Sequence, residues 1–144
     1  MGAGQLVRAE TATGDVRVIL GTSIGPIAIG MSRSAITRVT GPPAATKQYG
    51  FYRFRVRGLT VLVSFGHWGR ARSLRADSGK LVVNGVPLSA GPSALTAALP
   101  QVQRSECGTY TTLFLPQGRR QSGFGFFTAP ALPRATIVNT AMRR

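Results

Sequence analysis

The sequence predicts a strand-rich α+β fold made of two tandem repeats, each with a short helix and an antiparallel meander of three to four strands. Three observations support this. Short apolar or alternating runs are separated by glycine-containing turns, as in antiparallel sheets. Two segments have helical spacing followed by helix-ending residues. The order strand, helix, three strands occurs twice along the chain. A length of 144 residues with 43% hydrophobic content is enough for one core, so we expect a single domain over residues 1–144.

The N-terminal region predicts a β-hairpin over residues 5–20. Gly14 and Asp15 supply the turn, and alternation through Val16 and Val18 marks the second arm. A short apolar strand at 27–29 follows. These elements would open the first half of the fold.

A helix is expected directly after this strand. Ser32 is a good N-cap residue, and Ala35, Ile36 and Val39 form an apolar stripe at helical spacing. The Gly-Pro-Pro sequence at 41–43 then ends the helix.

Three consecutive strands are predicted next, at 51–57, 59–65 and 70–76. Gly58 marks the first tight turn, and the Gly-His-Trp-Gly sequence at 66–69 forms the second. Together they form an antiparallel meander.

The second half repeats this order at a shift of fifty-nine residues. Ser-Ala-Ile-Thr at 34–37 corresponds to Ser-Ala-Leu-Thr at 93–96, and Phe51 corresponds to Tyr110. Three further strand-like runs follow the second helix, at 110–115, 121–127 and 134–140. The sequence therefore predicts internal repeats at approximately 22–78 and 81–140.

These motifs resemble a known module. Gly-Met-Ser-x-Ser-x-Ile-x-x-Val-x-Gly-Pro at 30–42, then Tyr-Gly at 49–50 and Gly-Leu-Thr-Val at 58–61, resembles the helix-then-sheet module of SmpA/OmlA-type envelope lipoproteins. Two such modules, spanning roughly 24–140, resemble the architecture of the β-lactamase inhibitory protein family of actinobacteria. The resemblance implies a bacterial, non-catalytic binding or inhibitory protein, often extracytoplasmic. Unlike that family, this chain is basic and lacks the disulfide cysteines.

The charge balance is the strongest global signal. Eighteen Lys and Arg stand against four Asp and Glu, a formal charge of +14. All the cations except Lys47 and Lys80 are arginines, whose planar fork suits carboxylate and phosphate. A GC-rich genome would explain the arginine preference but not the missing acids. We therefore expect an acidic protein partner, with nucleic acid as the alternative.

One predicted strand concentrates this charge. In the strand at 51–57, alternation places Arg53, Arg55 and Arg57 on one face at steps of about 7 Å, and aromatic and apolar residues on the other. Three like charges in a row favour a binding face for an anionic partner. The alternative is an ordinary solvated sheet face in an arginine-rich protein.

The third strand extends this surface. Arg70 and Arg72 have the same two-residue period, with Arg75 just beyond. In a meander the first and third strands flank the second, so we expect these arginines to share a face with Arg53 and its neighbours.

Three aromatic residues are predicted in loops beside this face. Tyr49 precedes the first strand of the meander, and His67 and Trp68 occupy the hairpin tip. Tryptophan and arginine dominate interface hot spots, so Trp68 is a candidate anchor. It would otherwise fold back as a lid on the core.

Catalysis has few available groups. His67 is the only histidine, Cys107 the only cysteine, and no residues have metal-ligand spacing, so no metal or cofactor is predicted. Cysteine is most often a small buried hydrophobe, which favours a structural role for Cys107 over a pair with His67. An RNase-type toxin domain, with His67 as acid or base and arginines on phosphate, is the alternative function. The only carboxylates are Glu10, Asp15, Asp77 and Glu106.

A transmembrane segment or a signal peptide in the sequence would indicate the compartment. The longest uncharged apolar stretch, 18–31, contains glycine and proline and is too short to span a bilayer, so no transmembrane segment is expected. Arg8, Glu10 and Asp15 interrupt any signal-peptide pattern. The protein would be extracytoplasmic if an export signal had been removed, and otherwise cytoplasmic. The sequence carries no signal for an oligomeric state.

Overall fold

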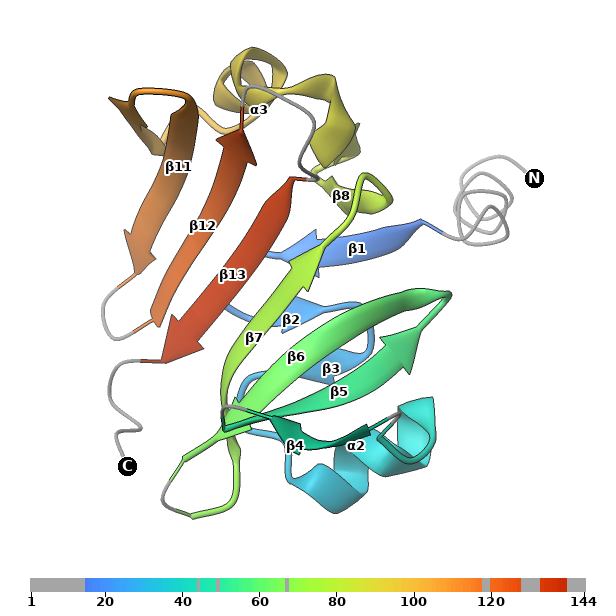
Figure 1. Ribbon diagram of the computed structural model, residues 1–144. Coiled ribbons are helices and arrows are strands. Elements are labelled where there is room, and N and C mark those ends of the chain that lie inside the picture. Colours follow the sequence, from blue (N-terminus) through green and yellow to red (C-terminus); the bar gives the residue numbers. More distant parts are fainter. Residues whose placement is uncertain are drawn as a thin grey trace, which may run out of the picture.

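Two β-sheets form the framework of the protein (Figure 1). The structure is a computed structural model, and it describes residues 15–43, 45–48, 50–66, 68–117, 120–127 and 133–139. The large sheet has eight antiparallel strands in the order β10-β11-β12-β13-β7-β6-β5-β4. Its strands are β4 (Ala45–Gln48), β5 (Phe51–Val56), β6 (Leu59–Phe65), β7 (Ala71–Asp77), β10 (Gln103–Cys107), β11 (Tyr110–Gln117), β12 (Arg120–Phe127) and β13 (Arg134–Asn139).

The small sheet has five short strands in the order β3-β2-β1-β8-β9. All its pairings are antiparallel except that of β1 with β8. Its strands are β1 (Val16–Ile19), β2 (Ser23–Ile24), β3 (Ile27–Ala28), β8 (Leu81–Val83) and β9 (Val86–Pro87). The fold is therefore a strand-rich α+β fold, as the sequence predicted.

Two short α-helices accompany the sheets in the described part of the chain. In α2 (Arg33–Thr40), Ser32 Oγ accepts a hydrogen bond from the Ala35 amide at 3.2 Å, which satisfies one of the free donors of the first turn. The helix ends at Gly41, whose φ of 92° favours glycine. Both ends were predicted. A 3₁₀ turn, η1 (Leu88–Ala90), precedes α3 (Pro92–Ala98).

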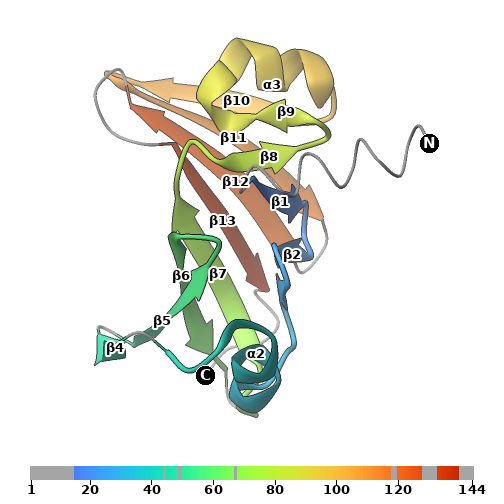
Figure 2. The same ribbon diagram turned by 90° about the vertical axis from the view of Figure 1, so that its right-hand side faces the viewer.

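The core lies between the two sheets. The small sheet and the helices pack on one face of the large sheet, as Figures 1 and 2 show from two directions. Strand alternation places one buried row of side chains across the six inner strands of that face: Phe54, Val61, Ala76, Ala135, Phe124 and Leu113. We call the opposite face, on which none of the described elements packs, the outer face.

The predicted meander at 51–76 is confirmed as β5, β6 and β7. Four strands, β2, β4, β8 and β10, were not predicted, because each is very short or lies at an edge of the large sheet and has little apolar alternation. The predicted stripe of α2 is only partly right, since Ile36 is fully buried but Val39 is 54% exposed.

The first arm of the predicted N-terminal hairpin, residues 5–8, lies outside the described residues. Its second arm is β1, which pairs with β2 and with β8. The pairing of β1 with β8 joins segments more than sixty residues apart, which local alternation cannot reveal.

Candidate binding surfaces

An arginine pair crosses the outer face of the large sheet. Arg53 on β5 is in register with Leu62 on β6, and Leu62 is in register with Arg75 on β7. Two strand spacings separate the two arginines, about 10 Å between their backbones. The predicted grouping of arginines from the first and third strands therefore exists, but Arg75 is its second member.

A shallow depression of about 490 Å³ surrounds this pair. Its lining includes Arg53, Thr60, Leu62, Arg75 and Asp77. Cations, a hydroxyl and an apolar side chain thus meet at one place on the outer face, where a partner's carboxylate could be held beside an apolar contact.

Arg75 is held in place by an aromatic ring. Its guanidinium carbon lies 5.6 Å from the ring centroid of Phe51, a cation–π geometry. Its Nε is buried and has no hydrogen-bond partner among the described residues, and the same holds for Arg72 Nε. Leaving a buried donor unsatisfied is costly, so an incoming acceptor that reached Arg75 would gain more than at a fully solvated arginine.

The neighbouring Asp77 is already paired. Arg134 Nε donates to Asp77 Oδ1 at 2.8 Å and Arg134 Nη2 donates to Oδ2 at 3.1 Å, a bidentate pair between β13 and β7. The hydrogen bond to Asp77 raises the pKa of Arg134 against partial desolvation, and the charge of Asp77 adds to the rise. Asp77, the one carboxylate among the described residues that line the depression, is therefore neutralised by Arg134.

Arg57 does not belong to this face, contrary to the prediction. Val56 pairs with Leu59, so Arg57 and Gly58 form a two-residue hairpin loop. Their φ angles of 49° and 86° identify a type I′ turn, which takes Arg57 out of the strand's alternation. Arg55 stays in the strand, and its Nη2 donates to the Gly58 carbonyl at 3.2 Å.

Arg70 and Arg72 also depart from the predicted ladder. Arg70 precedes β7, and its Nη1 donates to the Gly30 carbonyl at 3.3 Å in the loop before α2. A register shift pairs Ser64 with Ser73 but Phe65 with Ala71, so Arg72 is the extra residue of a β-bulge. The bulge interrupts the two-residue period between Ala71 and Leu74, which are both buried, so the outward alternation restarts at Ser73 and reaches Arg75.

The predicted loop aromatics divide into two groups. Trp68 is 82% exposed at the β6–β7 hairpin, so it is not a lid on the core. Tyr49 and His67 lie outside the described residues, and the RNase-type alternative therefore stays a prediction.

The remaining candidate chemistry is sparse within the described part of the chain. Cys107 is exposed on β10, contrary to the expected burial. No three His, Cys, Asp or Glu side chains among the described residues could hold a metal ion. Neither described helix approaches the length and apolarity that a membrane crossing needs.

The far half of the outer face is aromatic and glycine-rich. The ring of Tyr110 on β11 covers Gly125 on β12, and its Cζ would lie 2.8 Å from a Cβ at that glycine. Gly123 similarly lies beside Phe114, at 3.8 Å from an added Cβ to the Phe114 Cβ. Glycine lets an aromatic ring lie flat on the sheet, so this half presents rings where β5 and β7 present arginines.

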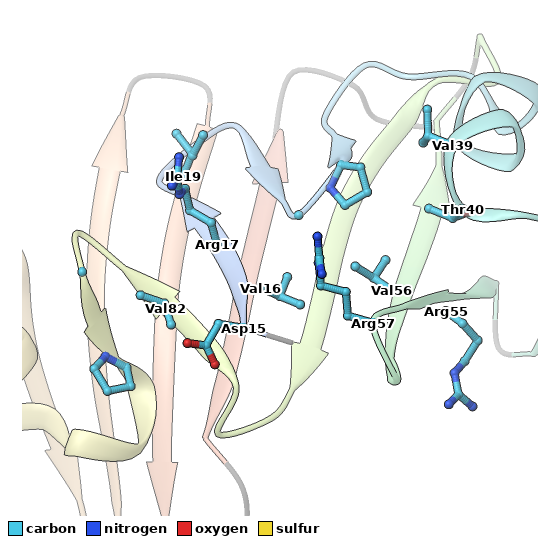
Figure 3. Close-up of a pocket in the computed structure, with 14 residues that line it drawn as sticks. Asp15, Val16, Arg17, Ile19, Val39, Thr40, Arg55, Val56, Arg57 and Val82 are labelled. Carbon is cyan, nitrogen blue, oxygen red and sulfur yellow. The ribbon is translucent and has the colours of Figure 1, made fainter. Parts of the chain in front are cut away.

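A second surface, which we call the groove, lies beside the small sheet (Figure 3). It has a volume of about 790 Å³ and is lined by β1, the β2–β3 turn, the β8–β9 hairpin, the end of α2 and the end of β5 with the turn that follows it. Sequence reasoning missed it because its residues come from five separate segments. The available signal was the alternation of β1: if Val16 and Val18 face inward, Arg17 and Ile19 must face outward.

The fold and these surfaces define a strand-rich α+β protein with one open sheet face. The sequence matches no protein-family model, and no curated protein is similar to it. Among solved structures, the fold is similar to the crystal structure of a DUF4309 family protein (YjgB) from Bacillus subtilis strain 168. The TM-score is 0.61, with 13% identity over 83% of this chain and 88% of that chain. At this identity the likeness concerns the fold alone.

Proposed function

We propose that the protein is a non-catalytic binding or inhibitory module that engages an acidic protein through the outer face of its large sheet. The observation that carries the proposal is the Arg53–Leu62–Arg75 row with its depression. Arginine, aromatic and apolar side chains together are the composition of interface hot spots, whereas a face that only needs solubility would carry lysine and glutamate.

Charge supports an acidic partner. The chain carries a net +14, and Asp77 beside the depression is offset by Arg134. An acidic partner surface would be attracted at long range and would find arginine forks at the contact. The Arg134 pair also keeps Asp77 from repelling that surface.

We further propose that the two halves form a tandem repeat of the kind that the resemblance to SmpA/OmlA-type modules implies. The order hairpin, helix, four-stranded meander describes β2 to β7 and again β8 to β13, with η1 added before the second helix. In the large sheet, β7 and β13 meet at the centre while β4 and β10 form the two edges, an order that a pseudo-twofold axis would produce.

The test is affinity purification from the native host with the wild-type chain, Arg53→Glu and Arg75→Glu, with and without nuclease. The matched control is Arg38→Glu, which makes the same charge change on the exposed side of α2. We expect an acidic polypeptide that survives nuclease, binds the control and loses about tenfold or more affinity in both outer-face variants.

Two results would contradict the proposal. Loss of all captured material on nuclease treatment would indicate nucleic acid, and a steep salt dependence would accompany it. Equal capture by Arg53→Glu and wild type would move the interface elsewhere. Because Arg75 is half-buried, Arg75→Gln serves as a second variant, and thermal unfolding checks that each variant remains folded.

A further inference from the structure

The groove exposes aliphatic side chains that the core does not use. The exposed large hydrophobics among the described residues are Ile19 (49%), Val39 (54%) and Trp68 (82%), and the first two both line the groove. Val82 and two prolines add apolar surface between them, above the buried side chains of Val16 and Val56. Apolar side chains gathered in a concavity mark a binding surface more than the same residues scattered singly.

Strand alternation accounts for this exposure. In β1, Val16 and Val18 are buried, so the pleat turns Arg17 and Ile19 away from the core. A strand whose outward face needed only solvation would not require isoleucine at the second of these positions. Ile19 thus has no role in the core, and its side chain is free to meet a partner.

Cations surround the apolar lining. Among the described residues that line the groove, Arg17, Arg55 and Arg57 stand against one carboxylate, that of Asp15. Figure 3 shows Arg57 rising between Val16 and Val56, while Arg55 projects away at the edge. The type I′ turn fixes the backbone from which Arg57 projects, at a φ that non-glycine residues rarely adopt.

We propose that the groove binds an extended segment of a partner protein that combines acidic and aliphatic side chains. The arginines complement carboxylates, and Ile19 and Val39 complement aliphatic side chains. Its volume of about 790 Å³ lies within the range of roughly 300–1,000 Å³ that is usual for ligand sites.

Protein fits this lining better than nucleic acid. None of the described residues that line the groove is aromatic, so it offers no platform for stacking bases. Its lining residues differ from those of the depression on the outer face, and it therefore constitutes a second site, beyond the function proposed above.

The test is selection of a displayed library of random decapeptides on the full chain. Three double variants are compared with wild type. The first, Ile19→Ser with Val39→Ser, removes the aliphatic contacts of the groove, and the second, Arg17→Gln with Arg57→Asn, removes two of its charges. Asparagine is chosen at 57 because it tolerates positive φ. The third, Trp68→Ser with Arg38→Gln, is a matched control that removes an exposed hydrophobic and a charge outside the groove.

We expect selected peptides enriched in Asp or Glu together with Leu, Ile or Val. Synthetic copies should lose about tenfold affinity or more in each groove variant and less than about twofold in the control. Arg53→Glu should leave this binding unchanged, which separates the groove from the outer face.

Three outcomes would overturn the proposal. In the first, the selection yields no acidic-aliphatic sequences. In the second, the groove variants bind the selected peptides as tightly as wild type. In the third, a labelled single-stranded oligonucleotide binds wild type and the control but not the groove variants, which would assign the groove to nucleic acid. Circular dichroism of each variant shows that lost binding does not reflect lost structure.

Discussion

The two halves of the large sheet share a core face and differ on the outer face. Inside, Phe54 on β5 and Leu113 on β11 occupy positions fifty-nine residues apart, and both are fully buried. Outside, at the position one residue earlier in each strand, Arg53 stands in β5 where Thr112 stands in β11. The packing of the fold constrains the inner positions, whereas the arginines of β5 and β7 are not needed to form the sheet.

The largest expected effect tests the shared core face. Phe54→Ala and Leu113→Ala each remove a fully buried side chain and leave a cavity. We expect losses of about 3–5 kcal/mol for Phe54 and about 2–5 kcal/mol for Leu113 in the free energy of unfolding, measured with urea. A loss below ~1 kcal/mol at either position would show that the two halves do not depend equally on the core.

The next effect probes the aromatic half. Gly125→Ala would place a Cβ against the ring of Tyr110, so the ring must move. We expect a destabilisation of about 1–3 kcal/mol, as for overpacking. The matched control, Gly123→Ala, has only a 3.3 Å approach to the Leu113 carbonyl and should cost less.

A double-mutant cycle identifies the cause. If Tyr110 is the obstacle, Gly125→Ala should cost less in a Tyr110→Ala background than in wild type. Additive costs in the two backgrounds would assign the strain at Gly125 to the backbone of β12 instead.

A smaller effect concerns the ion pair at the junction of the halves. Asp77→Asn removes the partner of Arg134, whose side chain is 36% exposed while that of Asp77 is 42% exposed. At this exposure solvent screens the pair, so we expect a stability loss of about 1 kcal/mol or less. Because Arg134 is then uncompensated, retention on heparin should rise; unchanged retention would show that this part of the outer face does not contact the polyanion.

The smallest expected change in stability sharpens the comparison directly. Thr112→Arg places an arginine in β11 at the position fifty-nine residues after Arg53. We expect stability to change by no more than ~0.5 kcal/mol, as for surface substitutions. Binding of the acidic partner should be unaltered if recognition depends on the Arg53–Leu62–Arg75 row, and stronger if net charge alone drives it. Thermal unfolding and titration of the captured partner measure the two quantities.

Much of the fold follows from local sequence patterns. The cap at Ser32, the glycine at 41 and the alternation through β5, β6 and β7 each express a preference of the backbone over a few residues, and each was predicted correctly. Short strands such as β4 and β10 could not be predicted, because they exist through pairing with a neighbour and have no apolar period of their own.

The binding surfaces were less predictable. Charge and alternation pointed to arginines on this sheet, and Arg53 does lie on its outer face. The bulge at Arg72 and the type I′ turn at Arg57 each change which way one side chain points. One added residue reverses the alternation of a strand, so the bulge brings Arg75 into the row, while the turn takes Arg57 out of the strand and into the groove.

The sequence by itself determined a basic, strand-rich α+β chain with a capped helix and an arginine-rich meander. Only the tertiary structure decided that Arg53 and Arg75 flank Leu62 and that Asp77 is paired with Arg134. It also brought Arg17, Val39 and Arg57 around one groove. The physical reason is that composition and period are properties of a few adjacent residues, whereas a binding surface depends on register between strands that are distant in the chain.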